Sequence, residues 1–248
     1  MTSAQRSPKK ILFLIGWPLF FVLTAIGNFL YQAGMKYRFQ MDWGSLPTPE
    51  WFDHEYDLAF FPRLRKAHFF ERGVYLQEML KKSYRVLDLC CGDGSVTALF
   101  ISPHVESVVG VDFDKSAIAS AQRRYSGFSN TSFRQVDIRN LPFKPSEFDF
   151  VTWDTAIEHF TQQEMDNIFG SIRSLLKSDG VLAGSTVARQ EHLQHHDHEY
   201  EFESTAELET FLKRYFKNVY VWERPHADRR NFYFRCTDAD LNLKARSV

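Results

Sequence analysis

The sequence predicts an α/β protein: a doubly wound, mostly parallel sheet of seven strands with a terminal antiparallel hairpin, preceded by an N-terminal transmembrane helix. From Arg85 onward, short apolar runs alternate with helical patterns, which is typical of consecutive βαβ units. The last two apolar runs, 219–222 and 232–236, have no helix between them, so we expect them to pair antiparallel. Residues 11–35 contain no charged side chain, which indicates a membrane-spanning helix.

Length and charge limit the classes of protein to consider. The 248 residues are enough for one large α/β domain and an appendage. The formal net charge is −1, and nucleic-acid-binding proteins usually show a basic excess, so no nucleic-acid partner is expected. Two of the three cysteines, Cys90 and Cys91, are adjacent, which suggests no disulfide framework and fits a reducing compartment.

The uncharged run at 11–35 would extend about 37 Å as a helix, enough to cross a bilayer. A cleaved signal peptide and a helix lying in the membrane interface are alternative interpretations. Pro18 is expected to kink a spanning helix or to divide a re-entrant one. Basic residues flank the run on both sides, so its orientation is poorly determined, although their slight excess before the run would favour an inside N-terminus. The chain then divides into a tail with the anchor, an aromatic-rich cap with a lead-in helix, the α/β domain and a polar tail: residues 1–40, 41–84, 85–238 and 239–248.

Apolar periodicity places the elements of the α/β region. Strands are expected at 86–89, 108–112, 133–136, 148–153, 181–187, 219–222 and 232–236. Helices are expected where apolar residues recur at helical spacing: at 69–82, from Ser95, at 115–125, from Thr161 to near Gly180, and after Ser204. Asp114 is a candidate N-cap. Thr161 and Ser204 are each followed three residues later by glutamate, which is the pattern of a capping box.

The segment 85–97 is interpreted as a strand, a tight turn and the start of a helix. Gly92 and Gly94 allow the backbone to approach a ligand, and a helix N-terminus favours anionic groups. The alternative is a plain connection in which the glycines only make the turn. A dinucleotide-binding turn would have a third glycine where Thr97 stands. Asp88 would repel a pyrophosphate, whereas it suits a cofactor that carries an ammonium and a sulfonium.

Two further acids end neighbouring strands of the predicted sheet. Asp112 ends the second strand and Asp137 follows the third. The carboxyl ends of parallel strands meet at one edge of the sheet, where ligands bind in doubly wound folds. We expect Asp112 to accept hydrogen bonds from ribose hydroxyls and Asp137 to accept one from an adenine amino group.

From about residue 69 to residue 236 the chain resembles the class I S-adenosylmethionine-dependent methyltransferases. Their acid-x-Gly-x-Gly-x-Gly signature matches residues 88–94, with Cys90 in place of the first glycine, a small residue that is expected to be tolerated or to weaken cofactor binding. Residues 148–160 are similar to the family's Phe-Asp-x-Val…Glu-His stretch. The resemblance implies S-adenosylmethionine as the cofactor, with the following binding residues: Asp88, Cys90, Gly92, Gly94, Asp112, Phe113, Asp137, Ile138 and Asp154.

Methyl transfer is an in-line displacement that depends mainly on positioning the acceptor. A hydroxyl acceptor also needs a base, most often histidine. The candidate catalytic residues after strands four and five are Asp154, His159 and His195. A structural role is the alternative for His159, and the histidine-rich segment 192–198 is a solvated loop, a substrate lid or part of a metal site. Some family members hold a metal with Glu-x-x-Glu-His, but Thr155 replaces the first acid, so no metal is expected.

The expected function is methylation, preferably O-methylation, of a small acceptor that is apolar or membrane-associated, such as a lipid. The membrane contact is expected through residues 11–35. Because S-adenosylmethionine is made in the cytosol, the catalytic domain of this single-pass protein is expected to face the cytoplasm. The alternative is a catalytically inactive, membrane-tethered scaffold that still binds the cofactor. No pattern in the sequence indicates which atom is methylated or an oligomeric state.

Overall fold

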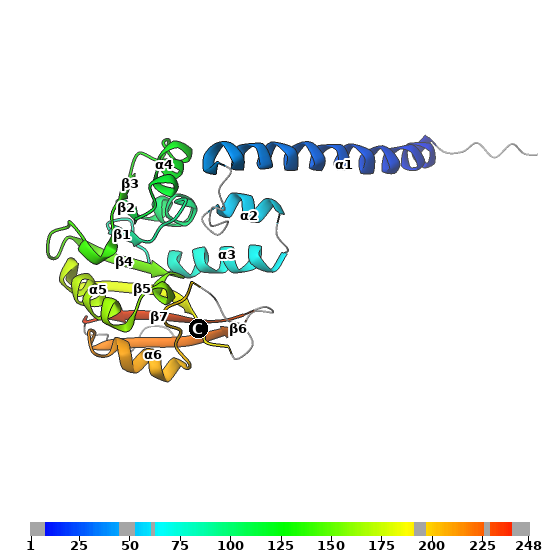
Figure 1. Cartoon of the computed structure of the whole chain (residues 1–248). Helices are drawn as coiled ribbons and strands as arrows, with labels where there is room; N and C mark the ends of the chain where they lie inside the picture. The colour runs from blue at the N-terminus through cyan, green and yellow to red at the C-terminus, as the bar shows by residue number, and fades with distance from the viewer. Residues whose placement is uncertain (1–7, 45–52, 61–62, 191–196, 226–228, 240–248) are drawn as a thin grey trace, which may run out of the picture.

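A computed structural model describes residues 8–44, 53–60, 63–190, 197–225 and 229–239 of the chain. The expected polar tail lies almost entirely outside the described residues, and His195 lies outside them as well. Figure 1 shows a layered α/β domain from which one long helix, α1, projects.

The sheet has the seven strands that the sequence predicts, and their order is β3-β2-β1-β4-β5-β7-β6. The strands β1 to β5 are parallel, and β7 pairs antiparallel with both β5 and β6. The strand order reverses between β1 and β4, and ligands of doubly wound folds bind at the carboxyl ends of the strands at such a point. The bounds are Arg85–Leu89 (β1), Ser107–Asp112 (β2), Thr131–Gln135 (β3), Phe148–Asp154 (β4), Leu176–Val187 (β5), Asn218–Pro225 (β6) and Arg230–Thr237 (β7).

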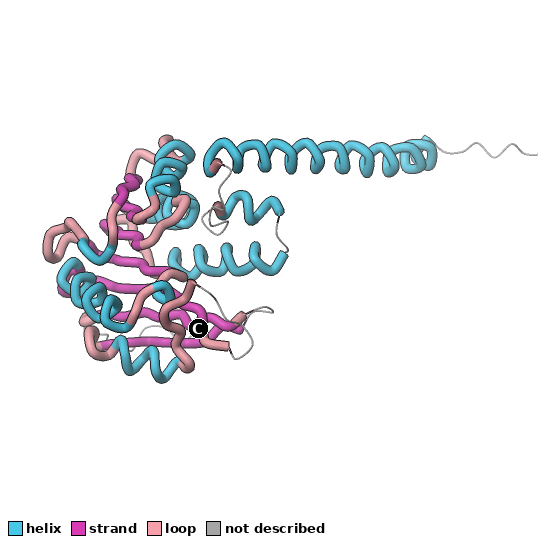
Figure 2. Tube along the Cα trace, viewed as in Figure 1, coloured by secondary structure: helices cyan, strands magenta, loops and turns pink. Residues whose placement is uncertain are grey.

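Helices cover both faces of the sheet (Figures 1 and 2). Alternate residues of β1 face opposite layers: Val86 packs with Leu76 of α3 and Phe100 of η2, whereas Leu87 packs with the helices of the other face. The first layer consists of α3 (Arg63–Gln77), the π-helical turn η2 (Thr97–Ile101) and α4 (Lys115–Arg124). The second consists of α5 (Gln162–Leu175) and α6 (Thr205–Leu212).

Helix α1 (Pro8–Trp43) is longer than the predicted membrane span, and Pro18 lies inside it. It is the one helix in the described part of the chain that is long and apolar enough to cross a membrane. Its residues 16–34 are exposed, and burial begins at Met35 and recurs at Trp43. The C-terminal end of α1 lies over α2 (His54–Phe60) and α4, while the apolar part projects away from the domain (Figure 1).

The N-caps expected at Asp114, Thr161 and Ser204 are confirmed, because each side chain accepts a backbone N–H of the following turn. The expectation that α5 continues to near Gly180 is wrong. The helix ends at Leu175, and Leu176 already pairs with Phe148 as the first residue of β5. Helix α3 covers 63–77 rather than the expected 69–82.

Candidate active site

The turn after β1 has the backbone conformation that a glycine-rich ligand loop requires. Cys90, Gly92 and Gly94 have φ angles of 56°, 54° and 75°, a region that favours glycine. A Cβ on Gly94 would also lie 2.5 Å from the Phe133 ring. The Gly92 amide donates to Asp112 Oδ2 at 2.9 Å, so the turn is joined directly to the end of β2.

Four buried carboxylates gather around the carboxyl ends of β1, β2 and β4: Asp88, Asp112, Asp154 and Glu158. Burial raises the pKa of Asp88 to about 7; the Thr97 hydroxyl opposes this shift, and the negative charges of Asp154 and Asp112 add to it. Burial also raises the pKa of Asp112, against the backbone hydrogen bonds that it accepts. Such an edge is complementary to a cation, because a positive ligand favours the ionised form of each carboxyl group.

The remaining predicted cofactor residues lie along the same edge. Asp112 also accepts from the Asp114 amide at 2.9 Å, and the Phe113 ring between them is exposed. Asp137 caps a short 3₁₀ turn, η4 (Ile138–Asn140), while the Ile138 side chain is buried in the core. These positions offer carboxylate acceptors and one exposed ring at the rim.

Asp154 ends β4 and is already engaged by two partners. The Arg72 guanidinium, from α3, forms an ion pair with Oδ2, and the Ser185 hydroxyl donates to Oδ1 at 2.5 Å. A carboxylate held in this way is a weaker candidate for proton abstraction, because both of its oxygens already have a partner. Its evident role is to join the lead-in helix to the edge of the sheet.

His159 lies in the 3₁₀ turn η5 (Ile157–His159) after β4. Its Nδ1 lies 2.9 Å from the Asp197 carbonyl oxygen, and its ring meets that of His198 edge-on with centroids 5.0 Å apart. Candidate ligand atoms of Glu158, His159 and His198 all lie within 4.8 Å of one another. Carboxylate and imidazole are ligands that zinc accepts, so this group is able to hold a divalent cation.

The residues that hold these groups in place are not among those that the sequence motifs indicate. Arg72 precedes its partner Asp154 by 82 residues, and Thr186, whose hydroxyl donates to Glu158 at 2.8 Å, belongs to the next strand. Neither residue lies in a local motif. Only the pairing of β4 with β5 and the packing of α3 bring them to the edge.

The fold and this edge agree with the comparison to known families. The model of a methyltransferase domain family matches residues 80–224, more than half of the chain. The chain belongs to this methyltransferase domain family. The match runs from just before β1 into β6, so it includes the glycine-rich turn and all four buried carboxylates.

Three known proteins illustrate the similarity. The uncharacterized methyltransferase YcgJ of Bacillus subtilis is 33% identical over 123 residues, 47% of each chain. A demethylmenaquinone methyltransferase of Staphylococcus saprophyticus is 34% identical over 84 residues, 33% of this chain and 36% of the relative. The structure of DhpI in complex with SAH has a TM-score of 0.59 and 25% identity, covering 75% of this chain and 91% of DhpI. The chain spans about half the length of the curated relatives it matches, or less.

Proposed function

We propose that this chain is an S-adenosylmethionine-dependent methyltransferase, anchored by α1, that methylates a small apolar or membrane-associated acceptor, preferably at oxygen. The observation that carries the proposal is the joining of the turn at Gly92 to Asp112 beside the buried Asp88. A dinucleotide is disfavoured because its pyrophosphate would meet buried carboxylates. An ammonium and a sulfonium fit them.

The residues at the edge divide the binding of this cofactor among them. Asp88 would take the ammonium group, Asp112 the ribose hydroxyls and Asp137 the adenine amino group, with Phe113 beside the base. The cofactor would supply an electrophilic methyl group on its sulfonium sulfur. The chain's own contribution is to hold the acceptor in line with that methyl group, which is mainly a positioning effect.

His159 is the proposed base for a hydroxyl acceptor. The Asp197 carbonyl oxygen can only accept, so a neutral His159 carries its hydrogen on Nδ1 and keeps a lone pair on Nε2. Nε2 would take the acceptor's proton as the oxygen–methyl bond forms and the sulfur–methyl bond breaks. His195 and Asp154 remain alternative candidates. A divalent cation held by Glu158, His159 and His198 is a second means of activating the acceptor, and it is favoured by their convergence.

The direction of α1 supports a membrane-associated acceptor. In Figure 1 the arrowheads of β4 and β5 point toward the side of the domain on which the apolar part of α1 projects. The carboxyl edge would therefore face the bilayer if α1 crosses it. Because S-adenosylmethionine is a cytosolic metabolite, we propose a single-pass topology with the catalytic domain in the cytoplasm.

A membrane-tethered scaffold that binds the cofactor without turnover is the second candidate. This candidate is favoured by Cys90. Its backbone has the left-handed conformation, at a position where the family signature has glycine. Cofactor binding that this residue weakens but does not abolish would reduce turnover and leave the fold intact.

The deciding experiment incubates the full chain, in detergent, with methyl-labelled S-adenosylmethionine and a lipid extract. The expected result is label in an extractable acceptor, absent with Asp88→Ala. A chelator added to the parent separates the two modes of activation, because only the cation-dependent one loses turnover. Binding of the cofactor without transfer to any acceptor would favour the scaffold.

A further inference from the structure

Asp93, the residue between Gly92 and Gly94, is fully buried and accepts hydrogen bonds from outside its own turn. His54, at the start of α2, donates its backbone amide at 2.8 Å, and its ring Nδ1 lies 2.9 Å from the carboxylate. The Ser95 amide and hydroxyl donate to the same carboxylate at 3.0 Å. The family signature leaves the position of Asp93 unspecified, so the signature does not predict these contacts.

Arg124 connects this carboxylate to the end of the membrane helix. Its guanidinium lies 3.4 Å from Asp93, 2.6 Å from Asp53 and 2.9 Å from Asp42, which is in the last turn of α1. The Arg124 side chain is only 8% exposed. Burial alone would raise the pKa of Asp53, but the hydrogen bond and charge of Arg124 outweigh it and hold that pKa below its ordinary value. Asp53 and Arg124 are thus an ionised, buried pair at the centre of this network.

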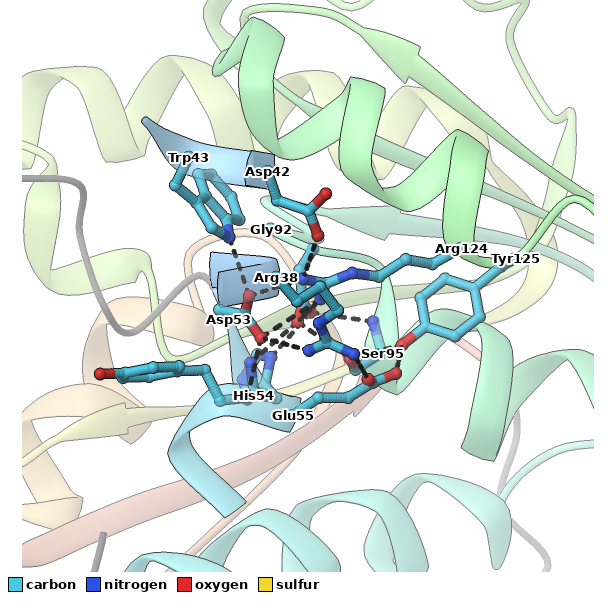
Figure 3. A network of polar contacts seen from close by, with 12 residues as sticks. Arg38, Asp42, Trp43, Asp53, His54, Glu55, Gly92, Ser95, Arg124 and Tyr125 are labelled. Atoms are coloured by element: carbon cyan, nitrogen blue, oxygen red, sulfur yellow. Dashed lines mark hydrogen bonds and ion pairs between the residues drawn. The ribbon is translucent and has the colours of Figure 1, made fainter. Parts of the chain in front are cut away.

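Further contacts close the network on both sides (Figure 3). The Trp43 indole donates to Asp53 at 2.8 Å, which joins the last residue of α1 to the residue before α2. On the other side, Glu55 accepts from the Tyr125 hydroxyl at 3.1 Å, and that hydroxyl lies 2.8 Å from the Ser95 hydroxyl. Ser95 is the first residue after the glycine turn and also donates to Asp93, so the contacts form a closed ring.

Half of this network lies outside the family match. The matched region begins at residue 80, whereas residues 38–55 belong to the anchor and the lead-in segment. The backbone conformation of Cys90, a non-glycine residue with a φ of 56° in the same turn, persists only where the surrounding contacts determine it. We propose that the C-terminal end of α1 and the start of α2 form a docking site that positions the cofactor turn. The seating of α1 on the domain and the affinity for the cofactor are then coupled.

This inference rests on the proposed function, since it assumes that the turn binds S-adenosylmethionine. Coupling of this kind is reciprocal: whatever seats α1 raises cofactor affinity, and the cofactor in turn favours the seated helix. Insertion of α1 into a bilayer would be the natural source of such seating. Asp42, Arg124 and His54 are positioning residues here, because none of them needs to touch the cofactor.

The test measures binding of S-adenosylhomocysteine to the full chain in detergent micelles by calorimetry. Asp42→Asn changes a residue of α1 that has no contact with the turn, and we expect roughly fivefold weaker binding, at the lower end of measured couplings. Arg124→Gln should weaken binding more, and Arg124→Lys should fall between, because it keeps the charge but loses the fork geometry. Asp166→Asn is the matched control, since it removes a carboxylate paired with Arg214 on the far helix layer.

A second readout is amide hydrogen exchange in residues 38–44 and 53–60, which saturating S-adenosylhomocysteine should slow. If Asp42→Asn and Arg124→Gln bind within twofold of the parent while their melting temperatures fall, the network is only structural and the inference is wrong. If Arg124→Gln does not fold, Asp42→Asn still decides. If the parent itself does not bind, the proposed function has failed, which is a different result from unchanged binding in the variants.

Discussion

The guanidinium of Arg72, on α3, is paired with the carboxylate of Asp154 at the carboxyl end of β4. Both side chains are largely buried, and the Ser185 hydroxyl occupies the other carboxylate oxygen. The pair therefore joins α3 to the end of β4. The proposed base, His159, lies in the turn that follows this strand.

Replacing Arg72 with methionine should destabilise the protein by about 3 kcal/mol, because Asp154 would remain buried without its cation. Urea unfolding of the full chain in detergent measures this loss. The double variant Arg72→Met/Asp154→Asn should recover at least half of it, since the uncompensated charge is gone. An exposed ion pair usually contributes less than about 1 kcal/mol. If Arg72→Met lowers the free energy of unfolding by less than this, the ion pair is not buried as assigned.

Cofactor affinity should rise with pH around neutrality. Asp88 has a pKa of about 7 in the cofactor-free protein, and only its ionised form attracts an ammonium group. Affinity for S-adenosylhomocysteine should therefore fall up to about tenfold per pH unit below 7. Calorimetric titrations at pH 6, 7 and 8 measure this slope, and Asp88→Asn should bind weakly with a flat profile. An equally steep profile in Asp88→Asn would assign the titration to another group.

The same carboxyl group should make the cofactor-free protein less stable as the pH rises. Its pKa is raised in the folded state from the ordinary value of 3.8, so the folded protein binds the proton more tightly than the unfolded chain. The stability it contributes is present at pH 4 and is lost as the pH rises to 7. Asp88→Asn should therefore melt roughly 3 °C or more above the parent at pH 8, and close to it at pH 4. If the parent and Asp88→Asn have equal melting temperatures at both pH values, burial of the ionised Asp88 carboxylate does not destabilise the protein.

His159→Asn should lower kcat about 100-fold or more, the usual contribution of a positioned base. Binding of S-adenosylhomocysteine should be unchanged, because His159 lies outside the glycine-rich turn. The value of kcat is measured by steady-state turnover with the acceptor found in the labelling experiment. The affinity for S-adenosylhomocysteine is measured by calorimetry. His104→Asn, in the turn before β2, is the matched control. A parallel loss of cofactor affinity in His159→Asn would indicate a structural role instead.

Cys90→Gly should stabilise the protein by about 1 kcal/mol, because a non-glycine residue at a φ of 56° is strained. Removing the side chain from the turn should also raise cofactor affinity severalfold. Thermal unfolding and calorimetry provide the two measurements. Weaker binding in Cys90→Gly would show that the thiol contributes to the site.

The sequence predicted the seven strands, and the acids and the glycine turn at one edge of the sheet, because these depend on local patterns: apolar runs that end in acids, and a turn with Gly92 and Gly94. It could not predict the contacts that hold this edge in place. Arg124 and Asp93 belong to separate motifs, and only the packing of α4 against the turn brings them together. The proximity of His198 to His159 likewise requires the segment after β5 to fold back, which no local periodicity indicates. The error at the end of α5 has a similar cause, because pairing with Phe148 overrides the helical pattern.

Helix α1 continues without a break from Met35 to Trp43, and its last turn is bonded to the domain. A continuous helix transmits both distance and rotation, at about 1.5 Å and about 100° per residue. If α1 enters a bilayer, the number of helical residues after Met35 therefore sets the height of the domain above the lipid. It also sets the direction in which the carboxyl edge of the sheet faces. One inserted residue would turn that edge by more than a quarter of a circle, while four would nearly restore the direction and raise the domain by about one helical turn.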